Sequence, residues 1–210
     1  MFTPDFSSAA EQNKHPILAQ LQQILPSRGA ALEIASGTGQ HAAWFGNHLP
    51  GWTWQPTDLT DGNFDSIRHY SQQAGATNVL PAQVLDVCSY PWLRTAQASG
   101  SGAVVFDLIF CANMLHIAPW SACAGLMAGA ARQLASGGRL VTYGPYFETD
   151  QPAAPGNLAF DESLRARDPA WGIRQLDDVA AQAERHGLAL QQRHAMPANN
   201  LLLVFAAAAS

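Results

Sequence analysis

Residues 31–42, which read ALEIASGTGQHA, constrain the fold of this chain more than any other stretch. An apolar run leads to Glu33, a turn follows with Gly37 and Gly39, and a helical pattern begins at Gln40. Glycine at both turn positions permits a tight turn and a close approach of ligand, because a Cβ would block both. A strand, a glycine-rich loop and a helix in this order open nucleotide-binding α/β folds. The alternative is an ordinary glycine-rich turn, so the rest of the chain has to decide.

The second predicted strand, residues 52–57, ends in Asp58. An acid at the carboxyl end of the second strand binds the ribose hydroxyls in Rossmann-like folds, so Asp58 is the predicted ribose ligand. Capping of a loop is the alternative role, and Asp61 competes for the ribose. A third strand is expected to end within residues 84–87, where Asp86 could accept a hydrogen bond from an adenine amino group or be a surface turn residue.

Strand and helix patterns alternate along most of the chain, which implies a parallel sheet with helices on both faces. We expect helices at 40–49, 62–74, 119–135, 161–167 and 176–186, and strands at 31–35, 52–57, 84–87, 104–110, 139–143, 188–194 and 201–206. No helix fits between the last two strands, so they should pair as a hairpin. The predicted fold class is an α/β, Rossmann-like, seven-stranded and mostly parallel sheet with an antiparallel C-terminal hairpin strand.

The other segments are expected to belong to one domain that covers residues 1–210. Residues 1–29 should form a helical cap, which starts with a capping box at Ser8 and is opened or kinked by Pro16. The sequence Gly-Pro-Tyr after residue 143 is expected to break the fifth strand. A flexible loop is predicted at 98–102 and a substrate-side loop at 147–172.

The composition argues against several classes of protein. Charged residues make up 13% of the chain and the net charge is −5 without a basic run, so binding to nucleic acid is not favoured. No signal-peptide pattern and no membrane-length apolar run is apparent, so a soluble cytoplasmic protein is expected. Cys88, Cys111 and Cys123 lack the spacing of a zinc site or a disulfide framework and are expected to be buried thiols. No metal site is predicted.

Two cofactors suit the glycine loop. The spacing Gly37-x-Gly39-x-x-Ala42 matches the dinucleotide fingerprint, and the same loop suits S-adenosylmethionine. Glu33 lies where the ammonium group of an amino-acid moiety would need a carboxylate. The terminal hairpin replaces the further parallel unit that a dinucleotide fold would have. Both features favour S-adenosylmethionine, while an NAD(P)-dependent oxidoreductase and a non-catalytic S-adenosylmethionine-binding protein remain the alternatives.

Seven segments then carry a resemblance to a known family, namely residues 10–18, 33–41, 54–58, 113–117, 143–146, 168–172 and 196–200. The chain resembles class I S-adenosylmethionine-dependent methyltransferases. More closely, it resembles the bacterial family called domain of unknown function 938, to which methyltransferase-like protein 26 of animals is similar. The resemblance runs nearly end to end. It implies methyl transfer from S-adenosylmethionine to an unidentified acceptor, expected to be a small molecule, and it leaves a homodimer open.

The resemblance also implies roles for particular residues. Glu33, Gly37 and Gly39 would line the methionine part of the cofactor, and Asp58 would bind the ribose. Asp86 and Val87 would lie at the adenine, and Asn113 and Met114 would lie beside the sulfonium. Relatives usually carry arginine where this chain has Gln12, which leaves Asn13 as a substrate candidate.

Methyl transfer from an activated sulfonium needs alignment and exclusion of water, and it needs a base only if the acceptor must lose a proton. His116 is the first candidate for that base, and Tyr143 and Tyr146 could shape the methyl channel. Ordinary packing is the alternative for all three. The remaining substrate candidates are Asn157, Arg167, Trp171, Asn199 and Asn200.

Overall fold

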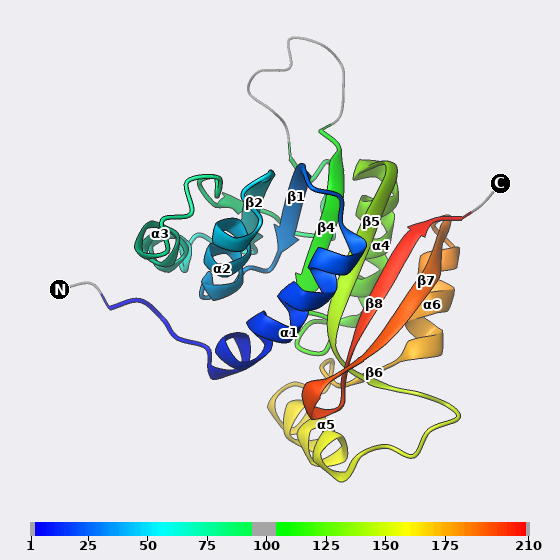
Figure 1. The fold of residues 1–210 in the computed structure, drawn as a ribbon. Coiled ribbons are helices and arrows are strands. Elements are labelled where there is room, and N and C mark those ends of the chain that lie inside the picture. The colour runs from blue at the N-terminus through cyan, green and yellow to red at the C-terminus, as the bar shows by residue number, and fades with distance from the viewer. Residues whose placement is uncertain (1–2, 94–103, 209–210) are drawn as a thin grey trace. The chain divides into compact units, whose positions relative to one another are not determined.

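The computed structural model describes residues 3–93 and 104–208 (Figure 1). The helices within these residues are α1 Ser8–Ile24, α2 Gln40–His48, α3 Phe64–Gln73, α4 Trp120–Gln133, α5 Pro155–Arg167 and α6 Leu176–Glu184. The strands are β1 Gly29–Ile34, β2 Trp52–Asp58, β3 Gln83–Val84, β4 Phe106–Ala112, β5 Leu134–Phe147, β6 Arg174–Gln175, β7 Leu188–Met196 and β8 Asn200–Ala207. A 3-10 turn, η1 Pro197–Asn199, connects β7 to β8. The loop expected at 98–102 lies outside the described residues.

The strands form one eight-stranded sheet in the order β3-β2-β1-β4-β5-β8-β7, and β6 pairs with β5. The pairs β1–β2 and β2–β3 are parallel, whereas β8 is antiparallel to both β5 and β7. The α/β class, the mostly parallel sheet and the terminal hairpin are therefore confirmed. The strand that the sequence did not indicate is β6, because two residues carry no readable periodicity.

The chain divides into two compact units. The first unit is Met1–Asp86 with Phe106–Phe110, and the second is Val87–Val105 with Cys111–Ser210. The expectation of one domain over residues 1–210 stays a prediction.

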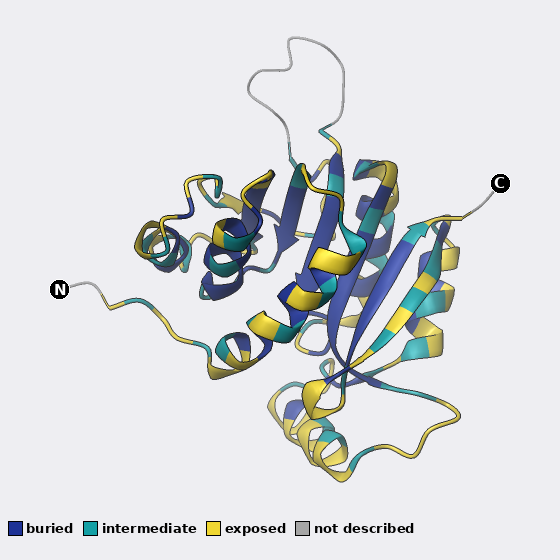
Figure 2. Cartoon of the chain, in the orientation of Figure 1, coloured by how far each residue is buried: buried dark blue, intermediate teal, exposed yellow. Residues whose placement is uncertain are grey.

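In the first unit, α2 packs against α1, α3 and β2. Its core is an aromatic cluster in which the ring of Phe45 lies 5.4 Å from the rings of both Trp54 and Phe110. Figure 2 shows buried strands in dark blue and exposed outer surfaces of α1 and α3 in yellow. The amphipathic helices therefore cover an apolar sheet, as the sequence pattern predicts.

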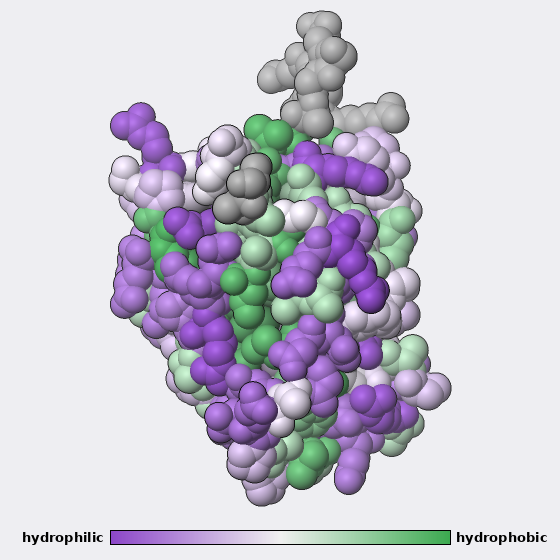
Figure 3. Space-filling view, turned by 90° about the vertical axis from the view of Figure 1, so that its right-hand side faces the viewer, coloured by the Kyte–Doolittle hydropathy of each residue, from purple (hydrophilic) through white to green (hydrophobic). Residues whose placement is uncertain are grey.

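In the second unit, α4 and α6 pack against each other, α4 also contacts β5 and α6 contacts β7. Strand β8 supplies the centre of the core, since Leu202 to Phe205 are 0% exposed. At the end of the sheet lies β7, whose exposed residues include Gln191 and Arg193. Hydrophilic side chains border narrow hydrophobic strips on the face seen in Figure 3. Such polar residues protect an edge strand from pairing with other chains.

Several local expectations were wrong in their details. Helix α1 continues through Pro16 as one element, so Pro16 does not open a second segment, whereas a kink at Pro16 stays a prediction. The N-cap is Ser7 and not Ser8, since the side chain of Ser7 accepts a hydrogen bond from the Ala10 amide. Proline removes the backbone hydrogen bond to residue 12, and Gln12 is exposed, so water can satisfy the freed carbonyl. The buried face around Ile17 and Leu21 keeps the helix in place.

Strand β5 also continues through the Gly-Pro sequence that was expected to break it. Gly144 pairs with Leu201 and Pro145 with Asn200 across the antiparallel ladder. Pairing with β8 therefore overrides the local turn preference. Helix α5 begins at Pro155 within the expected loop, well before the predicted start, and β3 ends at Val84 instead of continuing to residue 87.

Candidate active site

The loop between β1 and α2 has the conformation that its glycines permit. Ala35, Gly37 and Gly39 have φ of 55°, 54° and 88°, in the left-handed region. A Cβ on Gly39 would lie 2.4 Å from the Cα of Ile67 in α3, so this glycine is needed for packing. A Cβ on Gly37 would have nothing within 4 Å. Gly37 therefore leaves open space beside the loop, which a ligand can occupy.

Asp58 is fixed beside this loop by backbone donors. Its Oδ2 accepts from the Gly37 amide at 2.8 Å, and its Oδ1 accepts from the Leu59 amide at 2.7 Å. Each carboxylate oxygen has a further lone pair, so the group can still accept hydrogen bonds from a diol. The structure thus brings the predicted ribose ligand to the glycine loop.

Glu33 lies at the end of β1 and is only 2% exposed. Its Oε2 accepts from Trp54 Nε1 at 2.8 Å. Burial raises the pKa of Glu33 to about 8, although hydrogen bonds from Trp54 and Ser36 act in the opposite direction. The side chain is therefore mainly protonated at pH 7, and a bound cation would favour its ionised form. The partner Trp54 was not anticipated, because the sequence alone does not align β1 with β2.

Gln40, at the start of α2, ties the glycine loop to α1. Its Oε1 accepts from the Ser7 amide at 2.7 Å and from Thr38 Oγ1 at 3.0 Å, and its Nε2 donates to Glu11 Oε2 at 2.9 Å. Gln40 is 4% exposed. We call Ser7, Glu11, Thr38 and Gln40 the α1 clasp. The sequence did not predict the α1 clasp. Its contacts join residues that are separated by 29 or 33 positions in the chain, and no spacing rule covers such separations.

The substrate candidate Asn13 has a partner of its own. Its Oδ1 lies 2.5 Å from His41 Nε2, and both residues are buried. Burial, followed by the charge of Lys14, lowers the pKa of His41 to about 4. The imidazole is therefore neutral at pH 7 and can donate its Nε2 proton to Asn13. The structure thus gives Asn13 a packing role between α1 and α2, and its role in substrate binding stays a prediction.

The adenine candidates follow β3. Asp86 is exposed, and the preceding amide of Leu85 donates to the Asp58 carbonyl at 2.8 Å in the first unit. The carbonyl of Val87, in the second unit, accepts from Trp92 Nε1 at 3.1 Å. Both assignments stay predictions.

In the second unit, the side chains of His116 and Asn113 lie close to Gly144. A Cβ on Gly144 would lie 3.3 Å from His116 Nδ1 and 3.6 Å from Asn113 Oδ1. Asn113 has φ of 62°, and its amide donates to the carbonyl of Tyr143 at 2.7 Å. Met114 follows it and is 8% exposed. The structure therefore places the sulfonium candidates and His116 on one loop after β4.

His116 is 6% exposed, and burial, followed by the charge of Arg174, lowers its pKa to about 4. The ring is therefore neutral at pH 7 and has a nitrogen lone pair available, although a pKa this low makes it a weak base. Tyr143 is buried as well. The hydroxyl of Tyr146 donates to Thr142 Oγ1 at 2.8 Å, and burial raises the pKa of this tyrosine far above its ordinary value. Tyr146 is therefore a poor base, whereas His116 stays a candidate.

A pocket of about 210 Å³ in the second unit is lined by three of the six substrate candidates. Its lining includes Tyr146, Asn157, Asn199 and Asn200. Asn157 Nδ2 donates to the Asn199 carbonyl at 3.1 Å, and Asn199 has a left-handed φ of 56°. The other three candidates, Asn13, Arg167 and Trp171, do not line this pocket. The guanidinium carbon of Arg167 lies 5.0 Å from the centre of the Trp171 ring.

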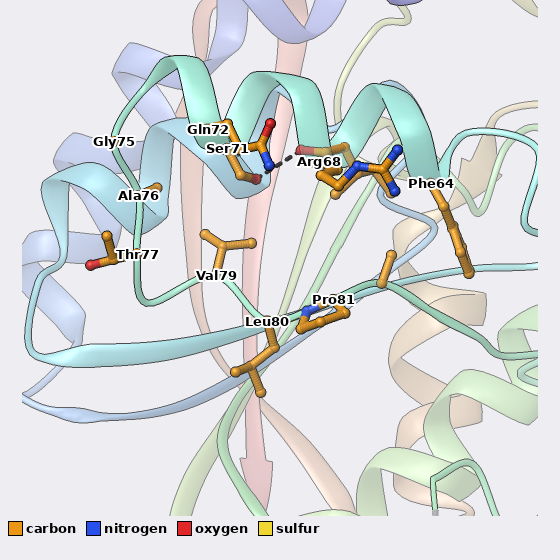
Figure 4. Close-up of a pocket in the computed structure, with 12 residues that line it drawn as sticks. Phe64, Arg68, Ser71, Gln72, Gly75, Ala76, Thr77, Val79, Leu80 and Pro81 are labelled. Atoms are coloured by element: carbon orange, nitrogen blue, oxygen red, sulfur yellow. Dashed lines mark hydrogen bonds between the residues drawn. The ribbon is translucent and has the colours of Figure 1, made fainter.

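A larger hollow lies elsewhere in the first unit. This pocket has a volume of about 580 Å³ and lies between α3 and residues 75–82. Figure 4 shows Phe64, Val79 and Leu80 among the residues that line it. None of the predicted cofactor residues lines it, so its size does not mark the cofactor site.

The described residues can also be compared with the requirements of a metal site, a membrane-spanning helix and buried thiols. No cluster of His, Cys, Asp and Glu side chains there has an arrangement that could hold a metal ion. No helix within 3–93 and 104–208 is long and apolar enough to cross a membrane. Cys111 and Cys123 are buried, but Cys88 is exposed, so the expectation of buried thiols was wrong for Cys88.

Solved methyltransferases share this fold. The chain is similar to mitomycin 7-O-methyltransferase MmcR, with a TM-score of 0.77, 16% identity, and coverage of 96% of this chain and 55% of that one. It is similar to CalO1, a methyltransferase in calicheamicin biosynthesis solved in its SAH-bound form, with a TM-score of 0.74, 14% identity, and coverage of 95% and 54%. A third is an O-methyltransferase family 2 protein from Planctomyces limnophilus in complex with apigenin, with a TM-score of 0.73, 17% identity, and coverage of 95% and 62%.

The chain thus has the Rossmann-like fold of these methyltransferases and spans little more than half of their length. The chain belongs to the DUF938 family, because the model of this family matches residues 4–207. The description of the family is "Protein of unknown function". The family membership inferred from the sequence motifs is confirmed. The similarity to methyltransferase-like protein 26 stays a prediction.

Proposed function

We propose that this protein transfers the methyl group of S-adenosylmethionine to a small-molecule acceptor. The observation that carries the proposal is the loop between β1 and α2, where Gly37 faces open space and Asp58 is held beside it. A small molecule suits the pocket of about 210 Å³ with its amide-rich lining. The acceptor, a cytoplasmic location and a homodimer stay predictions.

The residues present fit this cofactor. Gly37 provides room for the ligand, Asp58 keeps lone pairs for the ribose, and Glu33 becomes a counter-ion for the ammonium group once it ionises. Asp86 and Val87 would lie at the adenine, and Asn113 with Met114 at the sulfonium. The cofactor supplies an already activated methyl group when bound, so the chain has mainly to bind, orient and exclude water.

The ribose assignment is tested by calorimetry with S-adenosylhomocysteine (SAH). Asp58→Ala should weaken binding by about 1–3 kcal/mol, the cost of losing hydrogen bonds to a charged group. Asp61→Ala, at an exposed neighbouring acid, is the control and should bind normally. Unchanged affinity in folded Asp58→Ala would contradict the assignment. Tight binding of NADH in place of SAH would instead favour the oxidoreductase alternative.

His116 is the proposed base for acceptors that must lose a proton. Its ring is neutral above a pKa of about 4, so proton acceptance should persist well below pH 6.5. With an acceptor found by a methyl-transfer screen, His116→Gln should lower kcat by about 10²–10⁴-fold and leave SAH affinity unchanged. His15→Gln, an exposed histidine on α1, is the control. A normal kcat in His116→Gln would exclude the base role, and SAH binding without methylation of any acceptor would favour a non-catalytic binding protein.

A further inference from the structure

A second hollow in the second unit concentrates positive charge. This cavity of about 560 Å³ is lined by Trp120, Phe147, Arg165, Ile173, Arg174 and Arg185, with Asp178 as its one acidic lining residue. Lysine and arginine together number only 11 in a chain of net charge −5. Such a gathering of guanidinium groups against the overall charge attracts anions.

The guanidinium groups keep donors for a ligand. Arg174 donates from Nε to the Leu115 carbonyl at 2.9 Å, and from one Nη to the carbonyls of Ala118 and Ala170 at 2.6 and 2.9 Å. Its other Nη donates to no group among the described residues. Arginine carries five N–H donors, so two remain for an anion.

The other two arginines also have spare donors. Arg165 Nε donates to Asp161 Oδ2 at 2.8 Å, and Arg185 Nη1 donates to Gln182 Oε1 at 3.2 Å. Asp161 partly neutralises Arg165, and its Oδ1 accepts from the Ile173 amide at 2.7 Å, so this acid is occupied by the protein. The charge of Arg165 still acts on Arg174 and lowers its pKa after burial does. An anion between these groups would relieve the repulsion.

The rest of the lining is apolar and partly aromatic. Ile173 is 3% exposed and provides a buried floor, whereas Trp120 is 38% exposed and Phe147 is half-buried. The guanidinium carbon of Arg174 lies 5.7 Å from the centre of the Trp120 ring. A flat apolar group could therefore stack on the indole while its anionic group contacts the arginines.

We propose that this cavity is a binding site for a small aromatic anion, with a carboxylate or phosphate group held by Arg174 and Arg185 and an aromatic ring stacked against Trp120. The lining comes entirely from the second unit and includes none of the predicted cofactor residues. The site therefore goes beyond the proposed methyl transfer and is testable without cofactor.

The test is calorimetry on the full chain at fixed ionic strength with phenyl phosphate, benzoate and inorganic phosphate. Phenyl phosphate or benzoate should bind more tightly than inorganic phosphate, and the tighter of the two identifies the preferred anionic group. Arg185→Gln should weaken binding about tenfold, as expected for a lost charge-assisted hydrogen bond. Arg132 lies outside the cavity, with its guanidinium carbon 4.7 Å from the centre of the Tyr90 ring. The control variant Arg132→Gln removes the same charge and should bind the anions normally.

Trp120→Ala separates the two parts of the site. This variant should bind phenyl phosphate or benzoate more weakly than the parent and bind inorganic phosphate with unchanged affinity. The proposal is overturned if none of the three anions binds, or if Arg132→Gln weakens binding as much as Arg185→Gln, which would indicate only diffuse attraction. SAH binding, measured on the same samples, tests the proposed function separately.

Discussion

At the scale of single residues, the protonation state of Glu33 affects both the stability of the first unit and the predicted binding of a ligand. An unpaired buried carboxylate is costly, and this side chain avoids the cost by keeping its proton up to a pKa of about 8. The hydrogen bond from Trp54 fixes its position at the end of β1. Without a ligand, the protonated form of the Glu33 carboxyl has the lower free energy. A cation bound next to Glu33 would favour the ionised form. The position predicted to contact an ammonium group is thus prepared for one.

The raised pKa of Glu33 predicts a pH dependence of stability. Between the ordinary pKa of 4.5 and about 8, this carboxyl ionises in the unfolded chain but keeps its proton in the folded chain. The unfolded state is therefore increasingly favoured as pH rises through this window. Glu33→Gln should be more stable than the parent by up to about 4 kcal/mol near pH 8 and by little near pH 4.5. Urea unfolding across pH measures the difference.

Glu162→Gln, an exposed glutamate on α5, is the matched control and should follow the parent at every pH. A constant stability difference between Glu33→Gln and the parent from pH 4.5 to 8 would show that Glu33 is ionised in the folded chain.

At the scale of elements, the α1 clasp explains how a helix remote in sequence supports the glycine loop. Gln40 has both amide atoms bonded, to Ser7, Thr38 and Glu11. Ser66 Oγ adds a bond from α3 to the carbonyl of Thr38 at 2.8 Å. The loop conformation therefore depends on helices on both sides of it.

Loss of the clasp should loosen α1 at its start. Gln40→Ala leaves the Ser7 amide and the Thr38 hydroxyl without their acceptor, and this should cost about 1–3 kcal/mol. Hydrogen exchange should become faster at the first turn of α1 and in residues 36–41. Gln23→Ala, at an exposed glutamine near the other end of α1, is the control and should not change either segment. Equal exchange in Gln40→Ala and the parent would show that packing alone positions α1.

The order of the elements could be predicted from the sequence, and their lateral contacts could not. The helices after β1 and β2 follow from apolar periodicity, and the hairpin follows from the short connection between its strands. The continuation of β5 through Gly144 and Pro145 depends on pairing with β8, which local sequence does not encode. The same holds for the site: the glycine loop and Asp58 have a known spacing, but the bonds of Glu33 to Trp54 and of Gln40 to Ser7 are long-range.

At the scale of the whole molecule, the predicted cofactor contacts are divided between the two units. Glu33, Gly37 and Asp58 belong to the first, and Asn113 with Met114 to the second. The two sets of predicted contacts can therefore be tested separately. A ligand at about 100 times its Kd stabilises the state that binds it by about 2.7 kcal/mol, which corresponds to about 100-fold slower exchange through global opening.

Hydrogen exchange with and without saturating SAH tests this division of contacts. We expect slower exchange in residues 36–41 of the first unit and in residues 113–116 of the second, because each loop loses local opening when it contacts the ligand. Asp58→Ala at the same SAH concentration should show the smaller protection of a weaker complex in both segments. Protection confined to the first unit would mean that the ligand contacts the glycine loop alone. The assignment of Asn113 and Met114 to the sulfonium would then be wrong, even though the ribose assignment to Asp58 would stand.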